Sequence, residues 1–125
     1  MTFTIIITAL IAMESRGQVM AFNEAENAAG ILQIRPIMVK EVNRILTLRG
    51  ATPIFKNEHR WCPSKSRRMC TIFLMHQRDR YIQKMGKEPS YTQLAVSWNT
   101  GDIFKNNVKY ANGINKRIGT PNGKH

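Results

Sequence analysis

One glutamate follows the most apolar stretch of this sequence. Glu14 comes directly after residues 5–13, which contain one hydroxyl group and no charge, and Ser15 follows it. If that stretch forms a buried helix, the carboxyl group is partly removed from water, and desolvation raises the pKa of a carboxyl group. Glu14 would then hold a proton near neutral pH and could donate it as a general acid. The alternative is a glutamate that merely ends a helix at the surface.

Two further motifs carry polar side chains. The first is GILQI at residues 30–34, with Pro36 close behind. Glycine allows a close backbone approach, and Gln33 offers both a hydrogen-bond donor and an acceptor. The second is AVSWNTG at residues 95–101.

Together the three motifs resemble those of soluble lytic transglycosylases, relatives of goose-type lysozyme. Glu14 and Ser15 resemble the family's glutamate-serine motif. Residues 30–34 resemble its glycine-leucine-methionine-glutamine-isoleucine motif, and residues 95–101 its alanine-tyrosine-asparagine-alanine-glycine motif. The motifs occur in the family's order. The sequence departs from the family at Trp98, where tyrosine is usual, and at Arg35, where methionine is common.

The resemblance implies a peptidoglycan-cleaving muramidase that breaks the β-1,4 bond between N-acetylmuramic acid and N-acetylglucosamine, without a metal or cofactor. Glu14 would be the catalytic acid and base. The implied substrate-binding residues are Ser15, Gly30, Ile31, Gln33, Trp98 and Asn99. In this family one glutamate suffices, because the C6 hydroxyl of muramic acid attacks and closes a 1,6-anhydro ring. A lysozyme-type hydrolase would need a helper, for which the candidates are Glu24, Glu26 and Asp102.

Apolar periodicity predicts a mostly α fold of about five helices. A capping box at Ser90–Gln93 begins the fourth helix. Pro36 suits the first turn of the second helix, and Gly50 follows its end. The expected helices are residues 3–15, 37–49, 64–85, 91–98 and 104–118. By resemblance, residues 1–118 form one lysozyme-like domain with a substrate cleft. Residues 16–28 form a loop along that cleft with a small β-like region, and residues 119–125 a flexible tail.

The net charge of the protein favours some classes of binding partner over others. Lys and Arg exceed Asp and Glu by 19 − 8 = 11, which favours anionic polymers. Peptidoglycan and the anionic polymers of cell walls fit this charge. Nucleic acid is not expected as the main partner, because the basic residues are scattered without a recognition-helix signature. A basic nucleic-acid-binding protein and a wall-binding protein without catalysis remain the alternatives from other classes.

The sequence leaves the state of the two cysteines and the role of Trp61 open. Cys62 and Cys70 either form a disulfide or stay reduced, and a zinc site is not expected from two cysteines. Trp61 is either a sugar-stacking platform or, more commonly for such a residue, an aromatic anchor of its loop. The opening apolar run lacks the features of a signal peptide and is too short to span a bilayer. We expect a cell-envelope protein, or one from a phage or mobile element, or a domain of a longer chain.

Overall fold

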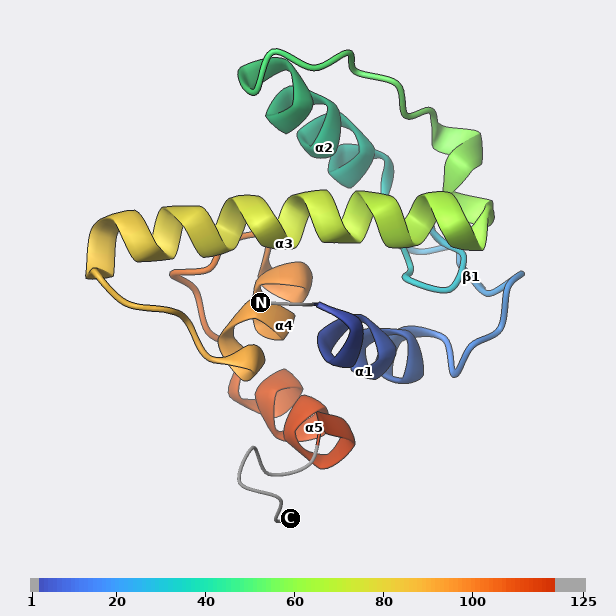
Figure 1. The fold of residues 1–125 in the computed structure, drawn as a ribbon. Helices are drawn as coiled ribbons and strands as arrows, with labels where there is room; N and C mark the ends of the chain where they lie inside the picture. The colour runs from blue at the N-terminus through green and yellow to red at the C-terminus, as the bar shows by residue number, and fades with distance from the viewer. Residues whose placement is uncertain (1–2, 119–125) are drawn as a thin grey trace. The chain divides into compact units, whose positions relative to one another are not determined.

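The computed structural model describes residues 3–118 and is mostly helical, as predicted (Figure 1). In the order of the chain, the elements are α1 (Thr4–Glu14), β1 (Phe22–Asn23), β2 (Ala28–Ala29), α2 (Pro36–Leu48), the 3-10 helix η1 (Asn57–Trp61), α3 (Pro63–Met85), α4 (Tyr91–Thr100) and α5 (Val108–Ile118). The expected tail, residues 119–125, lies outside the described residues. Four of the five expected helices begin and end within two residues of the observed ones.

The chain divides into two compact units. The terminal unit contains residues 3–13 and 74–118, and the central unit contains residues 14–73. The boundary falls within two helices, so that α3 contributes its first half to the central unit and its second half to the terminal unit. Glu14, the last residue of α1, belongs to the central unit together with the motif at residues 30–34.

The core of the terminal unit comes from apolar faces of α1, α4 and α5, and Figure 1 shows α4 and α5 side by side. Helix α4 is buried along residues 94–98, which is unusual for so short a helix. Helix α5 approaches α1 at Gly113, where an added side-chain carbon would lie 2.5 Å from Cε at the end of the flexible Met13 side chain. The glycine weakens α5 locally but allows this packing. The buried side chains of these helices include Ile6, Ile7, Ala9, Leu10, Tyr110 and Ile114.

Side chains set the ends of α4 and α5. The capping box predicted at Ser90 is present, since Ser90 Oγ accepts from the Gln93 N–H at 3.0 Å and Gln93 Oε1 accepts from the Ser90 N–H at 2.7 Å. The predicted start of α5 at Phe104 was wrong by four residues. Asn107 Oδ1 accepts a hydrogen bond from the Tyr110 N–H at 3.1 Å, so the helix begins after Asn107.

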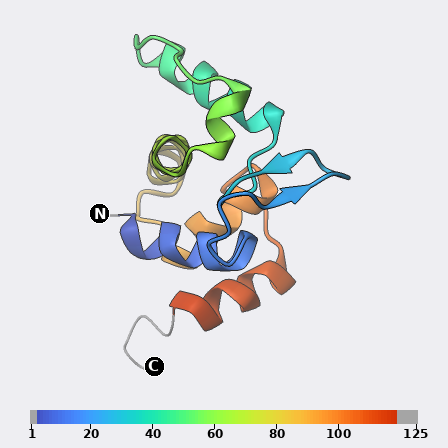
Figure 2. The same cartoon turned by 90° about the vertical axis from the view of Figure 1, so that its right-hand side faces the viewer.

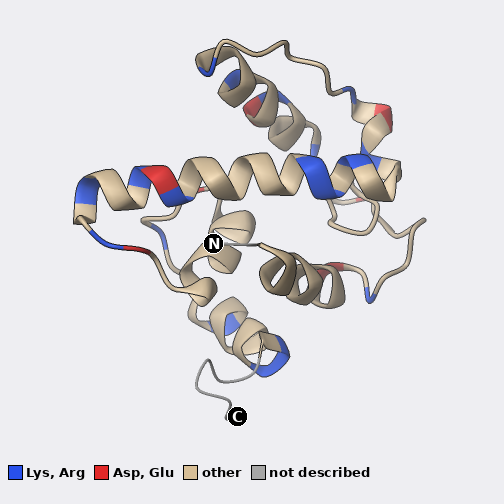
Figure 3. Ribbon diagram, in the orientation of Figure 1, with Lys and Arg blue, Asp and Glu red and all other residues tan. Residues whose placement is uncertain are grey.

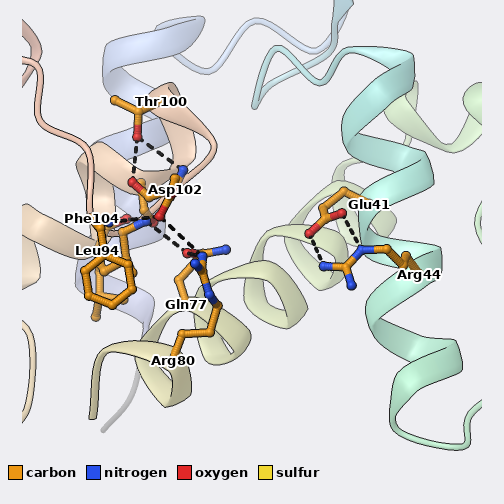
Figure 4. Close-up of polar contacts among 10 residues, drawn as sticks. Glu41, Arg44, Gln77, Arg80, Leu94, Thr100, Asp102 and Phe104 are labelled. Carbon is orange, nitrogen blue, oxygen red and sulfur yellow. Dashed lines mark hydrogen bonds and ion pairs between the residues drawn. The ribbon is translucent and has the colours of Figure 1, made fainter. Parts of the chain in front are cut away.

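A polar network joins α3 to the loop after α4 in the terminal unit (Figure 4). Gln77 is 1% exposed, and its Oε1 accepts from the Ile103 N–H at 2.9 Å and from Arg80 Nη1 at 3.0 Å. Asp102 accepts from the Phe104 N–H at 3.0 Å and pairs with Arg80 at 3.3 Å. The Phe104 N–H and the charge of Arg80 lower the pKa of Asp102. This carboxylate therefore has a structural role.

The central unit contains the small sheet and α2. Strands β1 and β2 pair in antiparallel register, with Phe22 opposite Ala29 (Figure 2). Pro36 occupies the first turn of α2, as predicted. The Asn43 side chain joins α2 to the following loop through both amide atoms, donating to Phe55 O at 2.9 Å and accepting from the Phe55 N–H at 3.1 Å. On the surface of α2, Glu41 and Arg44 form a salt bridge at 2.7 Å (Figure 4).

Positive side chains lie along α2, α3 and α5, whereas α1 and α4 have no Lys or Arg (Figure 3). The basic residues are scattered over several elements, as predicted from the sequence. Arg60 differs from this picture because its side chain is buried. Within residues 3–118, every helix falls short of the length and apolar character that a membrane crossing requires.

Replacing Gln77 by methionine tests the polar network of the terminal unit. Met keeps a similar volume but removes the acceptor of the buried Ile103 N–H, so we expect the free energy of unfolding to fall by about 2 kcal/mol. Urea denaturation measures this change. The control is Gln83→Met, on an exposed position of the same helix, which should shift stability by less than about 0.5 kcal/mol. Equal unfolding midpoints for the two variants would contradict the role of Gln77.

Candidate active site

Glu14 is half-buried at the end of α1, and the next residue connects it to the second motif. Ser15 is 7% exposed, and its Oγ donates a hydrogen bond of 2.8 Å to the carbonyl oxygen of Ile31. Ser15 Oγ also accepts a hydrogen bond of 3.1 Å from the Gly17 N–H. The chain leaving α1 is therefore held against residues 30–34, and the first two sequence motifs lie together in the central unit.

Gly30 occupies a backbone position that excludes other residues. Its φ is +81°, and its N–H donates to Ala21 O at 2.8 Å. A Cβ placed on Gly30 would overlap the carbonyl oxygen of Arg60. The left-handed conformation favours glycine, and the contact leaves no room for a side chain. The sequence predicted a close backbone approach at Gly30 in a substrate cleft, and the group that the structure places there is the backbone of Arg60.

Gln33 holds the shape of this loop. It has a positive φ of 49°, and its Nε2 donates to Ala21 O at 3.1 Å and to Gly30 O at 3.0 Å. The two carbonyl partners identify the nitrogen of the amide group. The sequence predicted a donor and an acceptor for substrate, but the donor is used within the loop. Only Oε1 of this partly exposed side chain can then serve as an acceptor for a ligand.

Arg60 stabilises the same loop, and sequence reasoning missed it. Its side chain is 8% exposed and donates from Nη1 to Asn27 O at 2.7 Å and to Ile34 O at 3.1 Å, and from Nε to Asn57 O at 2.9 Å. Its carbonyl oxygen accepts from Ser66 Oγ at 2.9 Å. From the sequence, Arg60 is one of many scattered basic residues and is expected at the surface. Nothing in the residues around it indicates that its side chain binds buried carbonyl groups.

Cys70 is a neighbour of Glu14 from α3. Burial raises the pKa of the Cys70 thiol well above its usual range, and the negative charge of Glu14 adds to this effect. The thiol therefore stays protonated and uncharged. Glu14 is thus close enough to Cys70 for its charge to act on the thiol, while Ser15 bonds to the Gly30 loop.

The two cysteines are free thiols. Cys62 directly precedes α3 and Cys70 lies within it. A helix rises about 1.5 Å per residue, so eight residues separate the Cα atoms by roughly 12 Å, beyond the limit of about 7 Å for a disulfide. Of the two states left open by the sequence, the reduced pair is the one found. Within residues 3–118, no cluster of three or more His, Cys, Asp or Glu side chains is arranged to hold a metal ion.

Trp98 and Asn99 belong to the terminal unit, on α4, and not to the unit that contains Glu14. Trp98 is 7% exposed. Asn99 is exposed, and its Oδ1 accepts a hydrogen bond of 2.9 Å from Nδ2 of Asn107. Of the predicted site residues, the structure therefore brings together Glu14 and the first two motifs within one unit.

The possible helper carboxylates differ in their surroundings. Glu24 and Glu26 are exposed in the turn between β1 and β2. Asp102 is engaged with Arg80 and the Phe104 N–H in the terminal unit. A pocket of about 370 Å³ in the terminal unit is lined by residues that include Tyr81, Gln93 and Phe104. None of the predicted site residues lines this pocket.

Substituting Gly30 by alanine should destabilise the protein more than the same change at Gly50. Both glycines have positive φ, but only Gly30 has backbone against the position of the added carbon. The strain of a positive φ costs about 1–2 kcal/mol. Overpacking at Gly30 adds about 1–3 kcal/mol. We expect urea denaturation to show a loss at Gly30 about twice that at Gly50, and equal losses would contradict the contact with Arg60.

The two thiols should react differently with iodoacetamide. A hydrogen bond with the Ser64 hydroxyl lowers the pKa of Cys62, and the Lys65 N–H contributes. Cys62 should therefore form a thiolate below the usual pH for a thiol, and alkylation of the folded protein should stop at one cysteine. Ser64→Ala should move the pH profile of alkylation upward. Mass spectrometry identifies the labelled residue, and labelling of Cys70 without unfolding would contradict its burial.

The contacts above come from the structure of this chain alone. Neither a protein-family model, nor a curated protein, nor a solved structure matches this chain. The juxtaposition of Glu14, Ser15 and Ile31 is therefore the observation on which a function for the central unit is based.

Proposed function

We propose that this protein is a muramidase of the lytic transglycosylase type. It cleaves the β-1,4 bond between N-acetylmuramic acid and N-acetylglucosamine in peptidoglycan, with Glu14 as general acid and base. The hydrogen bond from Ser15 Oγ to Ile31 O is the observation that carries the proposal. It supports a single site because it joins the glutamate-serine motif to the Gly30 motif, although the two are separate in the sequence.

The proposed reaction needs one carboxyl group. Glu14 donates its proton to the glycosidic oxygen, the bond to the anomeric carbon of muramic acid breaks, and positive charge develops on that carbon. The Glu14 carboxylate then takes the proton of the C6 hydroxyl of the same sugar, whose oxygen bonds to the anomeric carbon. The products are a 1,6-anhydromuramic acid end and a free 4-hydroxyl group, and no water is consumed.

The neighbours of Glu14 have positioning roles in this proposal. Ser15 fixes the chain that follows the catalytic residue, and Arg60 and Gln33 keep the Gly30 loop in shape. The backbone of Gly30 and Ile31 and the Oε1 atom of Gln33 would contact sugar beside the cleaved bond. The resemblance also gives Trp98 and Asn99 a substrate-binding role.

The charge of the protein suits this substrate. A formal net charge of +11 attracts the peptide carboxylates and anionic polymers of a bacterial wall. Such attraction weakens as salt is added, because exposed charges are screened beyond about 8–10 Å at physiological ionic strength. A cell-envelope location, or an association with a phage or mobile element, belongs to the same proposal.

Glu14→Gln should abolish the release of soluble fragments from purified peptidoglycan. Glutamine has nearly the same shape but cannot donate a carboxyl proton, and loss of general acid catalysis typically lowers a rate by about 10²–10⁴-fold. Mass spectrometry of the fragments measures both rate and chemistry. The wild-type protein should give anhydro ends, which are one water lighter than hydrolysis products.

Glu58→Gln is the matched control, because Glu58 is an exposed glutamate of the same unit outside the site. It makes the same change in net charge and should keep the wild-type rate. Full activity of Glu14→Gln would refute the assignment of the acid. Hydrated reducing ends would refute the transglycosylase chemistry in favour of a hydrolase, and Glu24→Gln and Glu26→Gln would then identify its helper.

A further inference from the structure

Two aromatic rings form an exposed feature of the central unit. The ring centroids of Phe22 and Trp61 are 5.7 Å apart, and the ring planes are inclined by 33°. Phe22 is 48% exposed and Trp61 is half-buried. About half of the surface of Phe22 stays exposed after folding, and this part is available to a ligand.

Backbone contacts attach both rings to the Gly30 loop. Phe22 pairs with Ala29 in the small sheet, and the Gly30 N–H donates to Ala21 O at 2.8 Å. On the other side, the Cα of Trp61 lies 3.7 Å from the position that a Cβ on Gly30 would occupy. The aromatic pair is therefore held beside Gly30 by two segments that are distant in sequence.

The surroundings of the pair favour a sugar. The turn that follows Phe22 carries exposed polar side chains, namely Asn23, Glu24, Glu26 and Asn27. An open aromatic face bordered by hydrogen-bonding groups matches a pyranose ring, which has apolar C–H faces and a polar rim. A protein partner would instead gain most from the apolar side chains just before Phe22, Val19 at 44% and Met20 at 75% exposed.

We infer that Phe22 and Trp61 form a platform on which an N-acetylhexosamine ring of a glycan strand stacks. This inference rests on the proposed function, because the stacked sugar would belong to the same glycan strand whose glycosidic oxygen Glu14 would protonate. The platform contributes to substrate affinity and takes no part in proton transfer.

The test is a calorimetric titration with tetra-N-acetylchitotetraose, a soluble β-1,4-linked glycan. All variants carry Glu14→Gln, so that the probe is not cleaved. Phe22→Leu removes the ring but keeps an apolar side chain, and we expect the dissociation constant to rise roughly tenfold, as for the loss of one good aromatic contact. Phe22→Tyr keeps the ring and should bind like the parent protein.

Met20→Ala is the control for a merely apolar surface, because Met20 is exposed close to Phe22 in the chain. It should leave the dissociation constant unchanged. Trp61→Phe keeps a ring at the second position. It should preserve binding but remove the fluorescence change that the parent protein shows on binding, since the other tryptophan, Trp98, is buried. Urea midpoints establish that each variant is folded.

The outcomes separate this inference from the proposed function. Equal affinity of Phe22→Leu and the parent protein, or no binding of the saccharide, would overturn the platform even if wild-type protein releases anhydro fragments. A similar loss on Met20→Ala and on Phe22→Leu would also overturn it, in favour of an apolar docking surface. Ring-dependent binding would support the platform even if no fragments are released, in which case only the catalytic proposal fails.

Discussion

The contact between Gly30 and the carbonyl group of Arg60 is the constraint on which the central unit depends. It requires a glycine with positive φ and leaves no room for a side chain. The same arginine uses its buried guanidinium to bind the carbonyl groups of Asn27 and Ile34 at either end of the loop. A guanidinium with several N–H groups suits this task, because one side chain satisfies several buried acceptors. The loop is thereby given one shape before any ligand binds.

Side-chain hydrogen bonds within the central unit hold this loop to the end of α1. Ser15 connects the end of α1 to Ile31, and the donor of Gln33 is used inside the loop. Glu14, the proposed catalytic residue, ends α1 directly before Ser15 and so lies next to this loop in the chain. In the terminal unit, Gln77 accepts a hydrogen bond from the Ile103 N–H. Asp102 accepts one from the Phe104 N–H and pairs with Arg80, so both side chains hold the loop after α4 in place.

Much of the fold follows from local signals in the sequence. The capping box at Ser90, Pro36 in the first turn of α2 and Gly50 after its end all predict helix boundaries through short-range hydrogen bonding and backbone geometry. What depends on distant contacts could not be predicted. Arg60 has an ordinary sequence context, and only folding brings it to the carbonyl groups that make its burial possible. The hydrogen bond from Gln33 Nε2 within the loop likewise depends on the carbonyl oxygen of Ala21, which is twelve residues away in the sequence.

We propose that Glu14 and the Gly30 loop form one saccharide-binding catalytic site, and a crystal structure of Glu14→Gln with tetra-N-acetylchitotetraose would test this. We expect a glycosidic oxygen within about 3 Å of the carboxamide at position 14, the distance that proton transfer requires, with a sugar ring against the backbone of Gly30 and Ile31. Saccharide bound only elsewhere, for example in the pocket lined by Tyr81 and Phe104, would contradict it.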